Sequence, residues 1–220
     1  MGIMDIIGPV MVGPSSSHTA GACRIGLFAR QLLGRLPRHA QIDLHGSFAA
    51  TGEGHGTPLA LVAGLLGFSP EDERIPDAFA WAREAQLEVA FERKDLGNVH
   101  PNSARIHLDH DDRVVSASSI GGGRIHVWGI DGFQVDLDGE YPTVLVSYPD
   151  QRGVLGCVGS VLAEAGLNIA TIKAHRTERG GESLMTVELD QVPSAETLDA
   201  LNHLHPLEMV RFIPGLYSEC

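Results

Sequence analysis

The sequence has few of the features that mark metal-binding or disulfide-bonded proteins. It contains only 3 cysteines, Cys23, Cys157 and Cys220, and no two of them form the short-spaced pair that is usual in zinc and iron–sulfur sites. Their odd number favours reduced thiols. We expect Cys23 and Cys157 to be small buried side chains on helices and Cys220 to be exposed, although a terminal cysteine can also reach a neighbouring site as a ligand.

Basic residues and long apolar runs are also scarce. The 16 Lys and Arg residues against 28 Asp and Glu residues give a formal net charge of −12, which argues against nucleic acid or an anionic membrane as a partner. No apolar run approaches the roughly 18 residues that would span a bilayer. Residues 1–12 are apolar but lack a basic leader and a cleavage pattern, so we expect a cytoplasmic protein.

The most informative segment that is present runs from Gly13 to Thr19. It places three serines, a histidine and a threonine ahead of an apolar stretch with helical spacing. A Ser or Thr oxygen caps the first amides of a helix, and those amides together with the helix dipole attract a carboxylate. A cap needs one hydroxyl and this segment supplies four, so a ligand site competes with a merely decorated cap. The candidate substrate-binding residues are Ser15, Ser16, Ser17, His18 and Thr19.

A second loop places a histidine next to a helix. Gln41–Phe48 alternates apolar and polar residues, which predicts a strand. The following loop sets His55 among three glycines, and Thr57 is predicted to cap a helix over residues 59–66. The dipole of that helix favours a neutral imidazole, which can accept a proton. The alternative is an exposed histidine with no role.

A third loop, residues 97–103, contains His100, Pro101 and Asn102. The proline restricts His100 to extended conformations and so fixes the direction of its imidazole. Asn102 can orient that ring or bind a substrate. A hairpin follows over residues 104–119, and its histidine and aspartates are interpreted as an exposed strand face rather than as a metal site.

The pattern changes near residue 140, which divides the chain into predicted domains over residues 1–138 and 143–220. In the second domain β-branched runs alternate with amphipathic stretches. The predicted order is βαββαβ, the ferredoxin-like arrangement. Its strands are expected at residues 143–148, 168–176, 183–189 and 207–213, with helices at residues 153–165 and after a cap at Ser194.

The loop Asp150-Gln151-Arg152-Gly153 and the later Gly166-Leu167-Asn168-Ile169 resemble those of an ACT domain, a small amino-acid-sensing module. The usual ACT loop has proline where this chain has Arg152. The resemblance implies self-association, and an effector that is serine, another amino acid or nothing. The alternative is that the loop only turns and Asn168 only caps a strand. The candidate effector-binding residues are Asp150, Arg152, Gly153, Asn168 and Ile169.

Taken together, the loops GPSSSHT, GEGHGT and HPN, the last followed by Ser103-Ala104-Arg105-Ile106, resemble the β subunit of iron–sulfur-dependent L-serine dehydratase. The resemblance covers essentially the whole chain. It implies an α+β fold whose N-terminal domain is similar to the allosteric substrate-binding domain of phosphoglycerate dehydrogenase. It also implies a [4Fe–4S] cluster held by cysteines of a separate α subunit, and no metal ligand on this chain.

The resemblance further implies a mechanism. A cluster iron acts as a Lewis acid on the hydroxyl of L-serine, a base removes the α-proton, and the aminoacrylate product hydrolyses to pyruvate and ammonia. His55, His100 and Asn102 match the catalytic residues of the family. His100 is the first candidate for the base or proton relay, but the sequence alone does not decide which histidine takes the proton. A non-catalytic regulatory protein that senses an amino acid remains the alternative, and any need for a monovalent cation stays open.

Overall fold

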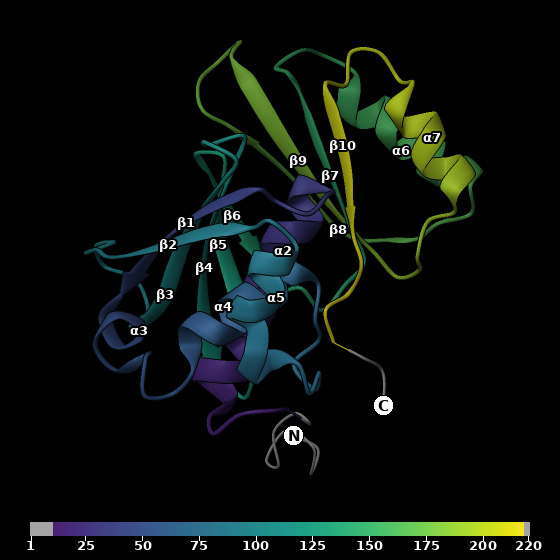
Figure 1. Ribbon diagram of the computed structural model, residues 1–220. Coiled ribbons are helices and arrows are strands. Elements are labelled where there is room, and N and C mark those ends of the chain that lie inside the picture. The colour runs from purple at the N-terminus through teal and green to yellow at the C-terminus, as the bar shows by residue number, and fades with distance from the viewer. Residues whose placement is uncertain (1–10, 218–220) are drawn as a thin grey trace. The chain divides into compact units, whose positions relative to one another are not determined.

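The computed structural model describes residues 11–217, which form two compact units (Figure 1). Within the described residues, the first unit comprises residues 11–131 and 135–138, and the second comprises residues 132–134 and 139–217. Each unit combines helices with its own sheet, so the predicted α+β class is confirmed. Across residues 11–217 there is no helix with the length and apolar character needed to cross a membrane.

The sheet of the first unit has six strands in the order β2-β1-β3-β4-β5-β6. β1 runs parallel to β2 and antiparallel to β3, and the β3–β4 and β4–β5 pairs are antiparallel. The strands are β1 His39–His45, β2 Glu88–Arg93, β3 Asn102–Leu108, β4 Arg113–Gly121, β5 Arg124–Ile130 and β6 Phe133–Leu137.

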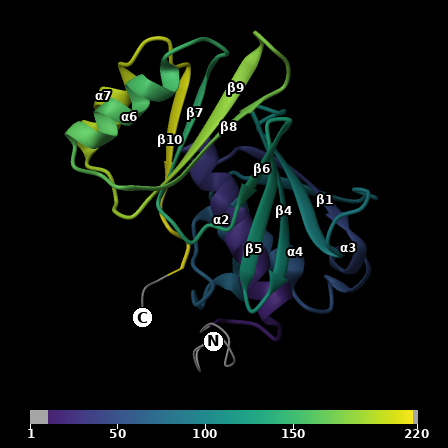
Figure 2. The ribbon, with the colours of Figure 1, turned by 180° about the vertical axis from the view of Figure 1, so that it is seen from behind.

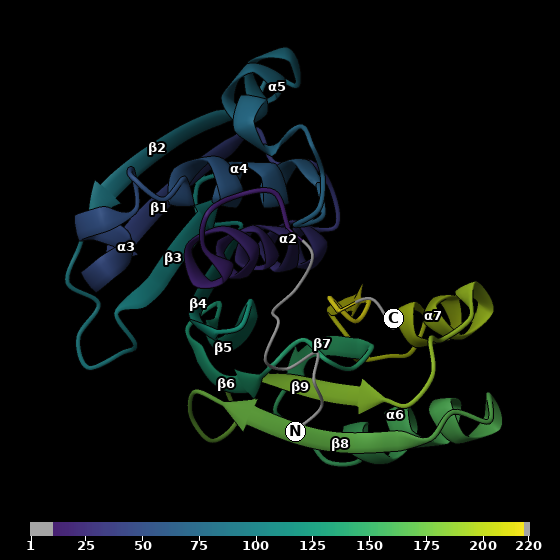
Figure 3. The same cartoon turned by 90° about the horizontal axis from the view of Figure 1, so that it is seen from below.

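The helices of the first unit pack closely on one another and on this sheet. They are η1 Ser16–Gly21, α2 Ala22–Leu33, α3 Gly46–Thr51, α4 Thr57–Leu66, η2 Ile75–Asp77 and α5 Ala78–Glu84. α2 lies beside α4 and packs on β3 and β4 (Figure 3). A Cβ added to Gly26 would lie 2.2 Å from the Leu61 carbonyl oxygen, and one added to Gly64 would lie 2.0 Å from that of Cys23. Glycine is therefore required at both positions for the two helices to approach.

The second unit has the predicted order of elements and a sheet in the order β10-β7-β9-β8. Its elements are β7 Thr143–Pro149, α6 Val154–Glu164, β8 Ile169–Arg176, β9 Glu182–Leu189, α7 Ala195–Asn202 and β10 Met209–Ile213. α6 and α7 cover one face of the sheet (Figure 2), and Val158, Leu162 and Val187 are among the side chains buried between them. Ser194 caps α7 as predicted, because its Oγ accepts a hydrogen bond from the Thr197 N–H at 3.2 Å.

Two local predictions in the first unit are wrong. The strand predicted over Gln41–Phe48 ends at His45, because Gly46 has a φ of +54° and turns the chain into α3. A Cβ at Gly46 would meet the backbone of Pro101 at 2.6 Å, so the turn also needs glycine for space. Gly56, and not Thr57, is the N-cap of α4, and the Thr57 hydroxyl is buried without a hydrogen-bond partner.

One of the two predictions of a buried cysteine is confirmed and the other is wrong. Cys23 is fully buried on α2, as expected, whereas Cys157 is exposed on α6. α6 buries Val154, Val158 and Leu162, which recur every four residues, and Cys157 lies beside this stripe rather than on it. Cys220 lies outside the described residues.

Candidate active site

Ser15 caps the helix that begins at Ser16, as the sequence predicts. Its Oγ accepts a hydrogen bond from the His18 N–H at 3.3 Å, and its carbonyl oxygen accepts one from the Thr19 N–H at 2.8 Å. η1 continues directly into α2, so the positive end of their combined dipole lies at this turn. Ser16 and Ser17 are half-buried, and the Ser17 Oγ lies 3.3 Å from the Ser15 Oγ.

His18 is the most enclosed of the three histidines at the predicted site, with 9% of its surface exposed. Its Nδ1 lies 3.2 Å from the Oγ of Ser17. Its Nε2 lies 3.2 Å from the Oγ of Ser47 and 3.4 Å from the Oγ1 of Thr51, both on α3. The rings of His18 and Phe48 pack edge to face, with their centroids 5.3 Å apart. The imidazole is thus held on both nitrogens by hydroxyls.

The loop that carries His55 is joined to the same cluster. The Thr19 hydroxyl donates to the His55 carbonyl oxygen at 3.4 Å, and the rings of His18 and His55 have their centroids 5.0 Å apart. His55 itself is exposed. Burial, followed by the nearby His55, lowers the pKa of His18, while a backbone hydrogen bond with Ser47 acts in the opposite direction. His18 is therefore neutral near pH 7.

The third predicted loop is joined to α3 by backbone hydrogen bonds. The Pro101 carbonyl oxygen accepts hydrogen bonds from the N–H groups of Ser47 at 2.8 Å and Phe48 at 3.4 Å. Nδ1 of His100 accepts a hydrogen bond from the Asn102 N–H at 3.1 Å. The His100 side chain is exposed, and Asn102 is half-buried at the start of β3.

The structure thus gathers most of the predicted site residues around α3, an element that the sequence reasoning missed. Ser47, Phe48 and Thr51 were assigned to a strand or a loop, although two alanines between Phe48 and Thr51 favour a helix. The sequence did contain an indication of this helix, because a glycine is followed there by two hydroxyl residues four positions apart, Ser47 and Thr51.

The predicted effector residues of the second unit are instead engaged with their own domain. The Asp150 carboxylate accepts from the Gly180 N–H at 2.9 Å and pairs with Arg176 at 3.3 Å, and the pKa of Asp150 is lowered, chiefly by the Gly180 hydrogen bond. The Asn168 side chain donates to Asp190, and the Asn168 N–H donates to Gln191 at 3.2 Å.

The remaining three effector candidates are distributed around the ends of α6 and β8. Gly153 is the N-cap of α6, Arg152 is exposed before it, and Ile169 is half-buried at the first position of β8. No hydrogen bond between the two predicted loops is found among residues 11–217. The five residues therefore do not form one hydrogen-bonded site in this unit.

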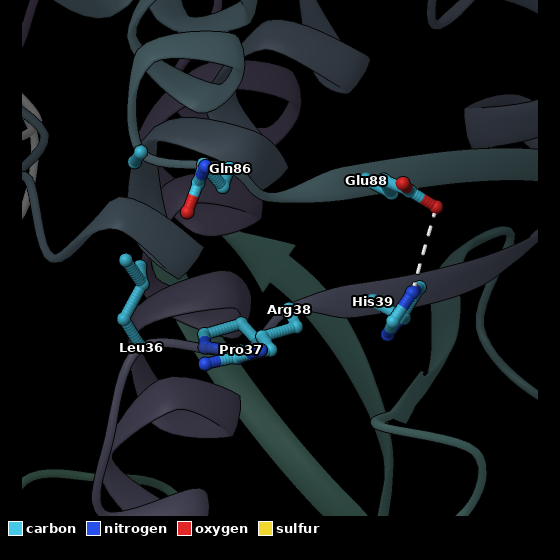
Figure 4. A pocket seen from close by; sticks show the side chains of 7 residues that line it. Leu36, Pro37, Arg38, His39, Gln86 and Glu88 are labelled. Atoms are coloured by element: carbon cyan, nitrogen blue, oxygen red, sulfur yellow. Dashed lines mark ion pairs between the residues drawn. The ribbon is translucent and has the colours of Figure 1, made fainter.

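A groove of about 420 Å³ in the first unit is separate from the candidate site (Figure 4). It lies where β1 begins, whereas α3 follows the other end of β1. An ion pair of 3.5 Å between His39 and Glu88 crosses it. The lining is Leu36, Pro37, Arg38, His39, Ala85, Gln86 and Glu88. None of these belongs to the loops that gather around α3.

The described residues do not fit a metal cluster. The Cys23 thiol donates to the Phe68 carbonyl oxygen at 3.2 Å, and burial raises its pKa to about 12, so the thiolate that a metal requires is disfavoured. Within residues 11–217, no three His, Cys, Asp or Glu side chains are arranged to hold a metal ion.

Two family profiles match the sequence. One, described as serine dehydratase beta chain, matches residues 3–83, and an ACT domain profile matches residues 142–205. The second match agrees with the order of elements in the second unit.

Similar proteins cover nearly the whole chain. The probable L-serine dehydratase beta chain of Bacillus subtilis is 42% identical over 204 residues, which are 92% of this chain and 93% of that protein. The L-serine dehydratase beta chain of Peptoniphilus asaccharolyticus is 42% identical over 219 residues, covering 98% and 96%. D-3-phosphoglycerate dehydrogenase of B. subtilis is 26% identical over 200 residues, covering 87% of this chain and 37% of the enzyme, which agrees with the fold expected.

Proposed function

The chain belongs to the family of L-serine dehydratase beta chains, and we propose that it forms part of an enzyme that converts L-serine to pyruvate and ammonia in the cytoplasm. Its partner in this proposal is a separate alpha subunit. The observation that carries the proposal is the convergence on α3 of three loops far apart in the sequence, which brings His18, His55 and the His100–Asn102 segment to one place.

The [4Fe–4S] cluster is assigned to the alpha subunit in this proposal. The described part of this chain lacks a ligand set for it, and the thiol of Cys23 is committed to a backbone carbonyl. The contributions of this chain are therefore binding, orientation and proton transfer by its own residues.

The first turn of η1 is proposed to bind the substrate carboxylate. The first amides of a helix have no intrahelical acceptor, and a carboxylate is favoured there by the dipole. Ser16 adds a hydroxyl at this turn, while Ser15 and Thr19 fix its shape through hydrogen bonds to His18 and to the His55 loop.

His55 is the better candidate for the base that removes the α-proton. The lone pair on Nδ1 of His100 is occupied by the Asn102 N–H, so neutral His100 carries its proton on Nε2 and acts as a donor. The His55 imidazole has no hydrogen-bond partner among residues 11–217, and it is exposed beside the His18 ring. His100 is then suited to orient the substrate or to return a proton, with Asn102 beside it.

Co-expression with the cysteine-bearing subunit under anaerobic conditions, followed by a pyruvate assay, tests the proposal. We expect serine-dependent pyruvate only when both subunits are present, and loss of turnover in His100→Ala with the subunits still associated. A regulatory protein would bind serine without any turnover in the complex. Full activity of this chain alone would contradict the division of the site between two subunits.

The ACT domain is proposed to mediate self-association and effector binding. Because Asp150 and Asn168 are already hydrogen-bonded within the domain, Arg152 and the backbone around Gly153 are the groups left to meet a ligand. Calorimetry with L-serine and other amino acids, compared between the full chain and Arg152→Ala, tests the effector site. Absence of binding and a monomeric chain in sedimentation would contradict this part.

A further inference from the structure

Four hydrogen-bond contacts meet beside the Nε2 atom of His18, and three of them involve Thr51. The Thr51 hydroxyl donates to the Ser47 carbonyl oxygen at 3.0 Å, one helical turn earlier. Its oxygen also lies 3.1 Å from the Ser47 Oγ and 3.4 Å from the His18 Nε2. The fourth contact joins the Ser47 Oγ to Nε2 at 3.2 Å.

The number of available protons distinguishes the two neutral tautomers of His18. If Nε2 carries no proton, only two protons, those of the Ser47 and Thr51 hydroxyls, are available for the four contacts. In the other two contacts, lone pairs then face each other with no proton between them. If Nε2 carries the proton, it is shared between the two α3 oxygens, Ser47 donates to Thr51, and Thr51 donates to the carbonyl. Every contact then contains a proton.

Whether His18 is charged at all is decided by its surroundings. A hydrogen bond with the Ser47 backbone acts to raise the pKa of His18, because it favours the charged form. Burial and the neighbouring His55 outweigh this effect, so that the neutral form is retained. Among the described residues in contact with the His18 ring, His55 is the titratable one, while η1 and α3 present hydroxyls and the Phe48 ring.

We propose that Thr51, acting through Ser47, is a positioning residue that holds His18 as its Nε2–H tautomer, so that Nδ1 accepts the hydroxyl proton of Ser17. In the 3.2 Å contact between them, Ser17 Oγ is then the donor and His18 Nδ1 is the acceptor. The Ser15 hydroxyl, whose oxygen already accepts from the His18 N–H, donates its own proton to Ser17 at 3.3 Å.

This order has a consequence for substrate binding, which rests on the proposed function. With its proton committed to Nδ1, Ser17 offers the remaining lone pair of its oxygen to a ligand. That lone pair suits the ammonium group of an α-amino acid, which donates, and not the carboxylate, which accepts. Ser16 and the first amides of η1 are left for the carboxylate. The ammonium group of an amino acid makes a charge-assisted hydrogen bond to this lone pair, which is stronger than the bond that the hydroxyl of a hydroxy acid makes there.

The tautomer is measured on the ¹⁵N-labelled full chain by long-range ¹H–¹⁵N correlation of the imidazole nitrogens. The spectrum of His18→Gln identifies the His18 resonances by their loss. We expect Nε2 of His18 to resonate as a protonated nitrogen and Nδ1 as an unprotonated acceptor. The reverse pattern in the wild-type chain would overturn the proposal.

Thr51→Val keeps the branched shape but removes the hydroxyl, and Thr51→Ser restores it. We expect Thr51→Val to shift His18 toward the Nδ1–H form and to lower kcat/KM for serine in the complex about 10-fold, the size of one lost hydrogen bond. Thr51→Ser should recover both. Ala50→Val, an exposed branched substitution on the same helix, is the matched control for helix stability.

The outcomes separate the positioning role from the proposed function. A wild-type complex without pyruvate formation, combined with the expected tautomer, defeats the proposed function and leaves the assignment of Thr51 supported. A tautomer that is unchanged in Thr51→Val overturns the assignment, whether or not activity falls. A shifted tautomer with wild-type kcat/KM overturns the role of Thr51 in the reaction.

Discussion

The two units of this chain use their polar side chains in opposite ways. In the first unit, hydroxyls and imidazoles from the Gly13–Thr19 segment, the His55 loop and α3 contact one another, while His55 and the serines of η1 keep free hydrogen-bonding capacity. In the second unit, the loop carboxylate Asp150 and the amide of Asn168 are already satisfied by neighbouring strands and loops. A loop motif therefore indicates a site only when its polar groups are left unsatisfied by the fold around them.

Removal of the proposed base tests this contrast most strongly. His55→Ala should lower serine turnover in the reconstituted complex by about 100-fold or more, the range of general-base catalysis. Asp150→Asn, which changes a carboxylate that ties its own loop, should change turnover by less than about twofold. Pyruvate formation by both variants is the measurement. Equal losses would mean that the second unit takes part in the chemistry.

Helix packing gives a second contrast between the units. Gly64→Ala places a methyl group 2.0 Å from the Cys23 carbonyl oxygen and should destabilise the chain by about 1–3 kcal/mol. Gly159→Ala on α6 meets nothing within 4 Å and should stabilise it by up to about 1 kcal/mol through helix propensity. Denaturant unfolding of the purified chain measures both. A neutral Gly64→Ala would show that α2 and α4 can separate at little cost.

The two helix caps form a matched pair. Ser15→Ala and Ser194→Ala each remove an oxygen that accepts a backbone N–H, and each should cost about 1 kcal/mol of unfolding free energy. Only Ser15→Ala should also raise KM for serine, because Ser15 shapes the proposed substrate turn. The comparison needs unfolding curves together with steady-state kinetics. An unchanged KM would show that the Gly13–Thr19 segment serves only as a structural cap.

The smallest effect is expected in the pH dependence of stability. The pKa of His18 is lowered in the folded chain, so below its ordinary value of 6.5 the unfolded chain binds a proton that the folded chain does not. Stability should therefore fall as the pH drops from 7 through 6.5 toward the folded pKa, and should become independent of His18 below it. His18→Gln should flatten this fall, whereas His203→Gln, which removes an exposed histidine of the second unit, serves as the control.

Local sequence patterns were sufficient for the order of elements in the second unit, although not for the exposure of Cys157. Its strands and helices follow apolar periodicity, and the Ser194 cap follows from residue type alone. The first unit was harder to predict at two points, residues 46–51 and the cap of α4, which is Gly56 instead of Thr57. The alternating pattern of Gln41–Phe48 continued past the strand end, and the turn at Gly46 depends on contact with Pro101, more than 50 residues later.

The sequence by itself determined the α+β class, the two-part organisation expected along the chain, and the loops that hold the candidate residues, because periodicity, capping and turn chemistry are local properties. The tertiary structure decided that Ser47 and Thr51 hold His18, that the Pro101 carbonyl joins the third loop to α3, and that Asp150 and Asn168 are occupied. These contacts join residues separated by 20 to more than 50 positions, so their distances exist only once the sheets and helices have packed. Which serine accepts, and which imidazole nitrogen carries a proton, follows from that packing and not from the motif.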